Sequence, residues 1–162
     1  MWIGGKWQIG SILPLVRDAD IKIALIHHPR NWLPQQDEQS FWPAMQAHFD
    51  FFLHGHEHHG WVHQDGRFVR IAAGASYHRH DKETGYSFVR LNIDEGTAEI
   101  WLRQFQEDSG RWAQRIIPTR TTDQGMLRLT GFPWKSRDHP QQVPVAPSRM
   151  MGRSTEVLLR YS

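Results

Sequence analysis

The sequence contains no cysteine, which excludes disulfide bonds and thiolate metal sites. It also contains no apolar run that approaches the roughly 18 residues of a membrane-spanning helix. The first residues do not combine a basic start with a long apolar stretch, so no signal peptide is expected. Together these absences predict a cytoplasmic protein without a membrane partner.

Strong charge of one sign is also missing. The formal net charge of +2 is too small to indicate nucleic acid as a partner, although it leaves that partner possible. Hydrophobic residues make up 39% of the chain, which is below the share of a typical globular domain. The 162 residues are enough for one modest domain, and the composition predicts that part of the chain stays outside its core.

Histidine is the residue in excess. The chain has 11 histidines, and all but His139 lie between His27 and His80. Two of them, His27 and His54, directly follow apolar runs of strand length. Neutral imidazole is a good ligand for transition metals, and a rigid strand end holds neighbouring imidazoles in place. The pattern therefore predicts a metal or phosphate site.

The spacing of apolar residues predicts an α/β fold. Helices are expected over residues 7–16 and 39–48, and buried strands over residues 21–26 and 49–53. A helix between two buried strands is typical of a parallel βαβ unit, which brings both carboxyl ends to one edge of the sheet. His27 would end the first strand, and His54-Gly55-His56-Glu57-His58 would follow the second.

The rest of the chain divides into hairpins and a tail. Two β-hairpins are predicted over residues 61–71 and 86–105, each with a glycine in its turn. From about residue 118 the chain is rich in proline and contains scattered arginines, which is typical of a linker. The expected division is a domain over residues 1–117 and a linker or disordered tail over residues 118–162.

The two histidine motifs, in this order and strand context, resemble those of the calcineurin-like metallophosphoesterases. Gly55-His56-Glu57-His58 fits the G-H-x-H signature of that family, and His27 fits the histidine that ends its preceding strand. The resemblance covers roughly residues 4–105. It implies a partial α/β/β/α sandwich whose two divalent ions, of the Mn, Fe or Zn type, hold a hydroxide that hydrolyses a phosphate mono- or diester. It also implies that His27, His56 and His58 are metal ligands, and that His28 and His54 support them or face the phosphate.

The motifs of the first half of that fold do not occur in this sequence: D-x-H, G-D-x-x-D and G-N-H-[DE] are all missing. In the family they supply the bridging carboxylate, and three imidazoles cannot hold two ions without one. The chain therefore resembles the C-terminal half of the fold. Alone it is expected to bind at most one ion weakly, with little or no phosphoesterase activity. A missing N-terminal half or a partner chain would supply the rest, and its absence would leave an open sheet edge.

Two other interpretations fit parts of the sequence. His54-x-His56-x-His58-His59 nearly matches the H-x-H-x-D-H signature of the metallo-β-lactamase fold, but His58 stands in place of its aspartate. The other is a non-catalytic interaction module or degenerate fragment, which would bind a partner through its eight tryptophans and arginine-containing tail. Salt-sensitive binding to an anionic polymer would indicate this interaction role, whereas metal-dependent cleavage of a phosphoester would indicate the enzyme.

Overall fold

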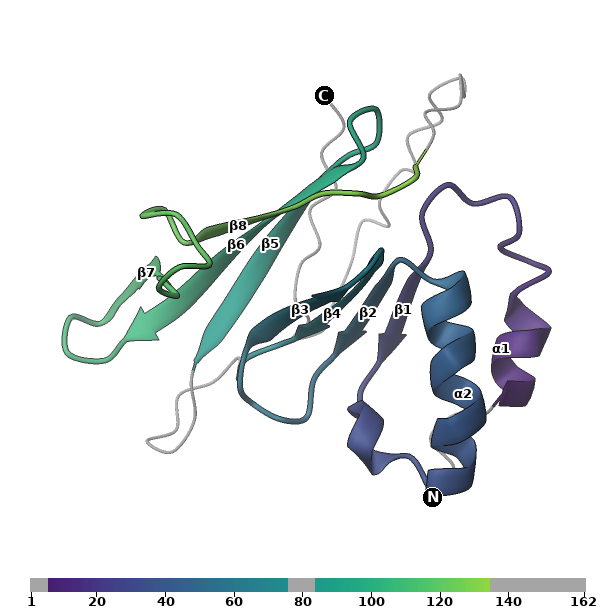
Figure 1. Cartoon of the computed structure of the whole chain (residues 1–162). Helices are drawn as coiled ribbons and strands as arrows, with labels where there is room; N and C mark the ends of the chain where they lie inside the picture. Colours follow the sequence, from purple (N-terminus) through teal and green to yellow (C-terminus); the bar gives the residue numbers. More distant parts are fainter. Residues whose placement is uncertain (1–5, 76–83, 135–162) are drawn as a thin grey trace, which may run out of the picture.

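The computed structural model describes residues 6–75 and 84–134, which form helices on one side of two stacked sheets (Figure 1). The elements are α1 (Lys6–Ile12), β1 (Ile23–Ile26), the short 3-10 helix η1 (Arg30–Trp32), α2 (Gln35–His48), β2 (Phe51–His54), β3 (Trp61–Asp65), β4 (Phe68–Ala72), β5 (Gly85–Asn92), β6 (Thr97–Gln106), β7 (Arg111–Gln114) and β8 (Met126–Leu129). The predicted α/β class is confirmed. Among the described residues, no helix is long and apolar enough to cross a membrane.

The first sheet contains the predicted βαβ unit. Its strand order is β1-β2-β4-β3, in which β1, β2 and β4 are parallel and β3 forms a hairpin with β4. The helix between β1 and β2 begins at Gln35, four residues before its predicted start. Pro34 occupies the N-cap, and Asp37 and Glu38 lie in the first turn. There their carboxylates stabilise the helix by interacting with the positive end of its dipole. By contrast, α1 ends early, at Ile12, because Pro14 lacks the N–H that a continuing helix needs.

The second sheet is antiparallel and is organised around β6. One side of β6 pairs with β5, in the predicted hairpin, and the other side pairs with β8 and then with β7. Its inner face packs on the first sheet through aliphatic and aromatic side chains. The buried cluster at this contact, to which both sheets contribute, comprises Phe51, Val62, Val69, Ile71, Ala98, Ile100, Leu102, Leu129, Phe132 and Trp134. A second cluster lies between the first sheet and the helices, and comprises Ile9, Ala24, Phe41, Trp42, Met45, Phe49, Phe52 and Phe68.

The prediction of a linker from residue 118 is wrong for the described part of that segment. The strand β8 pairs with β6 from Ala98 to Trp101, and both Phe132 and Trp134 are buried against Phe51. The composition hides this structure because a four-residue strand and two aromatic residues around Pro133 give no periodic signal. Residues 135–162, the remainder of the predicted tail, lie outside the described residues.

Gly96, in the turn between β5 and β6, offers a test of how tightly the chain end after β8 is held. Its backbone is left-handed, with φ of +60°, and a Cβ built there would lie 2.2 Å from the carbonyl oxygen of Phe132. Gly110 has a similar φ of +62° but no atom within 4 Å of such a Cβ. We expect Gly110→Ala to cost about 1–2 kcal/mol of unfolding free energy, which is the penalty for the backbone conformation. Gly96→Ala is expected to cost about 2 kcal/mol more, because Phe132 must also move. Urea denaturation measures both, and equal losses would contradict the packing described here.

Candidate metal centre

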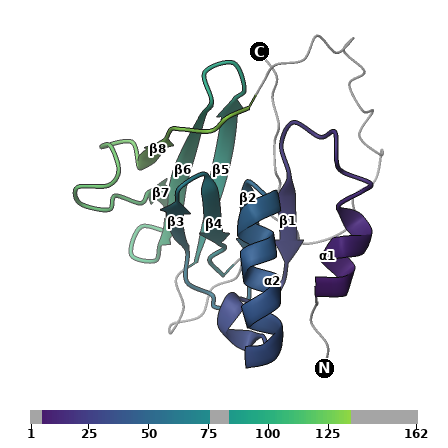
Figure 2. The ribbon, with the colours of Figure 1, turned by 45° about the vertical axis from the view of Figure 1, so that its right-hand side comes forward.

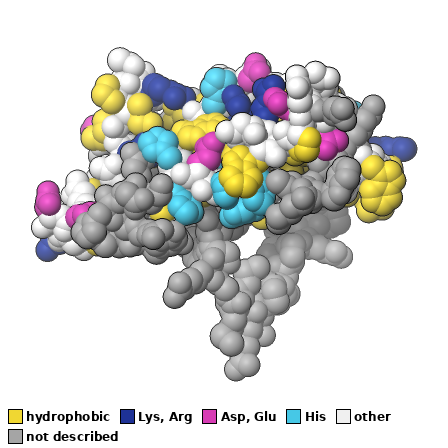
Figure 3. Space-filling model, turned by 90° about the horizontal axis from the view of Figure 1, so that it is seen from below, with side chains coloured by type: hydrophobic (Ala, Val, Ile, Leu, Met, Phe, Trp, Pro, Cys, Tyr) yellow, Lys and Arg dark blue, Asp and Glu magenta, His cyan; other side chains and the backbone are white. Residues whose placement is uncertain are grey.

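The carboxyl ends of β1 and β2 form the candidate site. Because these strands are parallel neighbours, their ends meet at one edge of the first sheet (Figure 1). His27 and His28 directly follow β1, and His56 follows β2 after one glycine. The backbone N–H of Gly55 donates to the carbonyl of His27 at 3.1 Å, which ties the two strand ends together. Figure 3, which views the molecule from below, shows histidine side chains gathered on this face around apolar side chains.

Three imidazoles form one cluster at this edge. His27, His28 and His56 each offer a ring nitrogen, and these nitrogens lie within 4.8 Å of one another. Nδ1 of His56 is 3.4 Å from Nε2 of His27, and the rings of His28 and His56 have centroids 4.9 Å apart. Desolvation, followed by the charges of His27 and His56, lowers the pKa of His28 below its ordinary value of 6.5. The neutral form of His28, which carries the lone pair that a metal needs, is therefore favoured.

Trp32 borders the cluster and is a neighbour that the sequence analysis missed. It is carried by η1, and its ring stacks on His28 with centroids 5.1 Å apart. It also meets the edge of His56 at 4.0 Å between centroids, and half of its surface remains exposed. The only signal in the sequence was its position four residues after His28. Because an indole is fluorescent and touches two of the three imidazoles, it can report on what binds there.

His54 does not join the cluster. Its side chain is 4% exposed and packs against the rings of Phe52 and Trp61, with centroids 5.4 and 5.1 Å away. Nδ1 of His54 lies 3.2 Å from the carbonyl oxygen of Gly55. Burial lowers the pKa of His54 below 6.5, so the neutral ring is favoured in the fold. In this position the ring links β2 to Trp61 of β3, across the intervening strand β4.

His58, a ligand according to the resemblance, is not a member of the group of three imidazoles. Both His56 and His58 have left-handed backbones, with φ of 68° and 56°. Such conformations are uncommon for residues other than glycine and occur often at functional sites. Between them, the carboxylate of Glu57 accepts a hydrogen bond from the indole N–H of Trp61 at 2.8 Å. The acidic group nearest in sequence to the cluster is thus held by a different partner.

The cluster fits one ion and does not fit two. Within residues 6–75 and 84–134, it is the one group of three or more histidine or acidic side chains with ligand atoms close enough to share an ion. All three ligands are imidazoles. Two ions a few Å apart need an oxygen ligand that bridges them, and the group contains no carboxylate. The dinuclear centre implied by the family resemblance is therefore not supported by these ligands.

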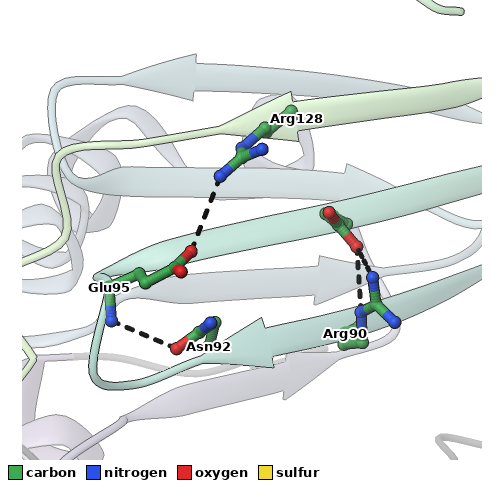
Figure 4. A network of polar contacts seen from close by, with 5 residues as sticks. Arg90, Asn92, Glu95 and Arg128 are labelled. Carbon is green, nitrogen blue, oxygen red and sulfur yellow. Dashed lines mark hydrogen bonds and ion pairs between the residues drawn. The ribbon is translucent and has the colours of Figure 1, made fainter.

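The outer face of the second sheet bears on the interaction role. Phe88 and Trp101 are cross-strand partners there, and Arg90 lies over the ring of Trp101 at 5.1 Å. Arg90 also pairs with Glu99, and Figure 4 shows this contact beside that of Arg128 with Glu95, which are 3.6 Å apart. These arginines already have carboxylate partners. The face is accordingly aromatic, and the positive charges of Arg90 and Arg128 are compensated.

The comparisons with known proteins give a partial likeness. No protein-family model matches the chain, and no curated protein matches its sequence. Among solved structures, a single mutant of Vps29 from Entamoeba histolytica has 15% identity and a TM-score of 0.41, over 57% of this chain and 53% of that one. Vps29 from Chaetomium thermophilum has 9% identity and a TM-score of 0.44, over 67% of this chain and 53% of that one. The chain spans about half the length of these structures, and the likeness conveys nothing about the histidine cluster.

Proposed function

We propose that this chain is a non-catalytic, degenerate domain of the metallophosphoesterase type that binds one transition-metal ion. The observation that carries the proposal is a cluster of three imidazoles, His27, His28 and His56, without a carboxylate. These three side chains would hold the ion at the junction of β1 and β2. When bound, such an ion supplies Lewis acidity and links the two strand ends. The set implied by the family resemblance differs in one ligand, with His58 in place of His28.

The donor set also limits which ion is proposed. An all-imidazole site suits Zn²⁺, Ni²⁺ or Cu²⁺, whereas Mg²⁺ and Mn²⁺ prefer oxygen ligands. The lowered pKa of His28 supports binding near neutral pH, because the ring does not have to lose a proton first. The outer positions of the site are open, since His27 is exposed and the other two side chains are only partly buried. Water or a ligand from another molecule can therefore reach the ion.

Hydrolysis of a phosphate ester is the competing function. It would require oxygen ligands that bridge a second ion, and the nearest carboxylate in sequence, that of Glu57, is hydrogen-bonded to Trp61. A partner chain that brings carboxylates to the ends of β1 and β2 would supply what this chain lacks. On that view the isolated chain binds a metal ion, and any phosphoesterase activity belongs to its complex with the partner chain.

Metal stoichiometry and turnover test the proposal together. We expect calorimetric titration of the metal-free protein to give one Zn²⁺ or Ni²⁺ per chain, with much weaker binding of Mn²⁺. Ni²⁺ should quench part of the tryptophan fluorescence, and Trp32→Phe should remove that part. The loaded chain is expected to hydrolyse p-nitrophenyl phosphate and its bis ester no faster than the free metal ion. Two bound ions with turnover that His56→Ala abolishes would show instead that the chain is a complete enzyme.

A further inference from the structure

A cavity of about 490 Å³ lies at the end of the first sheet opposite the histidine cluster. Two of its lining residues, Lys22 and Asp50, immediately precede β1 and β2, whereas the clustered histidines follow these strands. Each strand has four residues and spans about 13 Å, so the cavity is separate from the candidate metal centre. The loop after α1, the end of α2 and the end of the described chain contribute to its wall, and Figures 1 and 2 show these segments at the same end of the molecule.

Three cationic side chains line this cavity, and none of them has a carboxylate partner among the described residues. They are Arg17, Lys22 and Arg67. Nζ of Lys22 donates to the carbonyl of Ala19 at 2.9 Å, and Arg67 donates to the carbonyl of Ala47 in the last turn of α2. Each of these bonds uses one N–H, whereas an ammonium has three and a guanidinium has five. Most of the cationic donors around the cavity therefore remain for a ligand.

Two carboxylates also line the cavity, and with the three cations they leave a formal charge of +1. Asp50 is 8% exposed, and both of its oxygens already accept hydrogen bonds: Oδ2 from the backbone N–H of Lys22 and Oδ1 from the indole N–H of Trp134. Asp20 is partly buried and already has a contact partner. The formal charge counts His48, which ends α2, as neutral. A ligand with one negative charge would balance the remaining positive charge.

The rest of the wall is largely apolar and leaves room for a ligand. The larger apolar side chains in it are Leu13, Pro14, Pro133 and Trp134. Gly10, in α1, also lines the cavity, and a Cβ built there would meet no atom within 4 Å. The space beside α1 is therefore unfilled. A cavity with an apolar wall and a few polar groups is the usual setting for a small organic ligand.

We propose that this cavity binds a small monocarboxylate with an apolar body. The carboxylate would accept hydrogen bonds from the three cationic side chains, because a guanidinium fork and an ammonium both match its oxygens. The apolar body would lie beside Gly10, along the apolar wall. A ligand with two fused aromatic rings fits within 490 Å³, which is a typical volume for a small-molecule site. A neutral ligand would leave the charge of the cavity unbalanced, and a dianion would exceed it.

Equilibrium dialysis of the metal-free full chain against 2-naphthoate tests this proposal, which does not depend on metal binding. We expect one 2-naphthoate to bind per chain. The alcohol 2-naphthalenemethanol has the same rings without the charge, and it should bind about tenfold more weakly or worse. Acetate has the charge without the rings and should not displace 2-naphthoate at equal concentration. His56→Ala should leave the binding of 2-naphthoate unchanged, which separates this cavity from the metal centre.

Two variants locate the ligand in the cavity. Lys22→Met keeps the apolar stem and removes the charge, so it should weaken 2-naphthoate binding about tenfold. The control is Arg111→Gln, which removes an exposed charge on β7 outside the cavity and should change binding by less than about twofold. Gly10→Leu should fill the cavity from α1 and abolish binding, whereas Gly10→Ala should retain it. Neither substitution at Gly10 should lower the urea midpoint of unfolding, because glycine is the poorer helix former.

Three results would overturn the proposal. Equal binding of 2-naphthoate and 2-naphthalenemethanol would show a nonspecific apolar contact instead of a carboxylate site. Unchanged binding in both Lys22→Met and Gly10→Leu, or loss of binding in His56→Ala, would place the ligand elsewhere on the chain. Absence of binding at millimolar 2-naphthoate would show that the cavity does not take this class of ligand.

Discussion

His56→Ala is expected to weaken Zn²⁺ binding by about a hundredfold or more, because it removes the imidazole that contacts both other ligands. His56 Nδ1 lies 3.4 Å from His27 Nε2, and its ring also neighbours that of His28. Changes to groups that only support a ligand commonly cost about 10- to 100-fold in metal affinity, so the loss of a ligand itself should cost at least as much. Competition titration against a chelator of known affinity measures the effect.

A pair of variants decides which histidines complete the site. If the cluster in the structure binds the ion, His28→Ala should weaken binding about as much as His56→Ala, and His58→Ala should change it by less than about threefold. The reverse order would favour the ligand set of the metallophosphoesterase resemblance. His63→Ala is the control, since His63 is an exposed imidazole on β3 outside the cluster. Unchanged affinity in His56→Ala would refute the site altogether.

The meeting of His27 and His56 could be predicted from the sequence because it depends only on topology. Two apolar strands joined by a helix are usually parallel neighbours, and parallel strands end at the same edge. Which side chains join His27 and His56 depends on the local backbone conformation, and the pattern of apolar residues does not encode that conformation. The two-residue alternation of an extended chain predicts that His58 lies beside His56. That rule fails here because both residues have left-handed backbones.

His28 and Trp32 show the same limit from the other side. Strand alternation would point His28 away from His27, but β1 ends at Ile26, so the rule no longer applies to either residue. The rings of His27 and His28 lie with centroids 4.8 Å apart, and η1 then places Trp32 against His28. The composition does not reveal the structure of residues 118–134 for a related reason. Its contribution to the core comes from a few residues that pair far along the sequence, with β2 and β6.

Trp134→Ala is expected to cost about 3–5 kcal/mol of unfolding free energy, the usual range for removing a buried aromatic ring. Trp134 is 8% exposed, and its ring stacks on Phe132 with centroids 4.2 Å apart. Its indole N–H also donates to Asp50, which is itself 8% exposed. Asp50→Ala should cost about 2–4 kcal/mol, because it leaves the N–H groups of Trp134 and Lys22 without their acceptor. Urea denaturation followed by circular dichroism measures both losses.

Two further variants serve as controls. One separates the contribution of the Trp134 ring from that of its hydrogen bond, and the other tests the loss of an exposed tryptophan. Trp134→Phe keeps most of the stacking and loses the bond to Asp50, so about 1–3 kcal/mol of the loss should remain. Trp112→Ala removes a tryptophan that is 46% exposed, and it should cost clearly less than Trp134→Ala. If residues 118–134 were a linker, Trp134→Ala would cost less than about 0.5 kcal/mol. A domain is stable by only about 5–15 kcal/mol, so the loss of about 3–5 kcal/mol expected for Trp134→Ala would remove a large part of the total unfolding free energy. A loss of about 3–5 kcal/mol in Trp134→Ala would establish that the folded unit extends to Trp134.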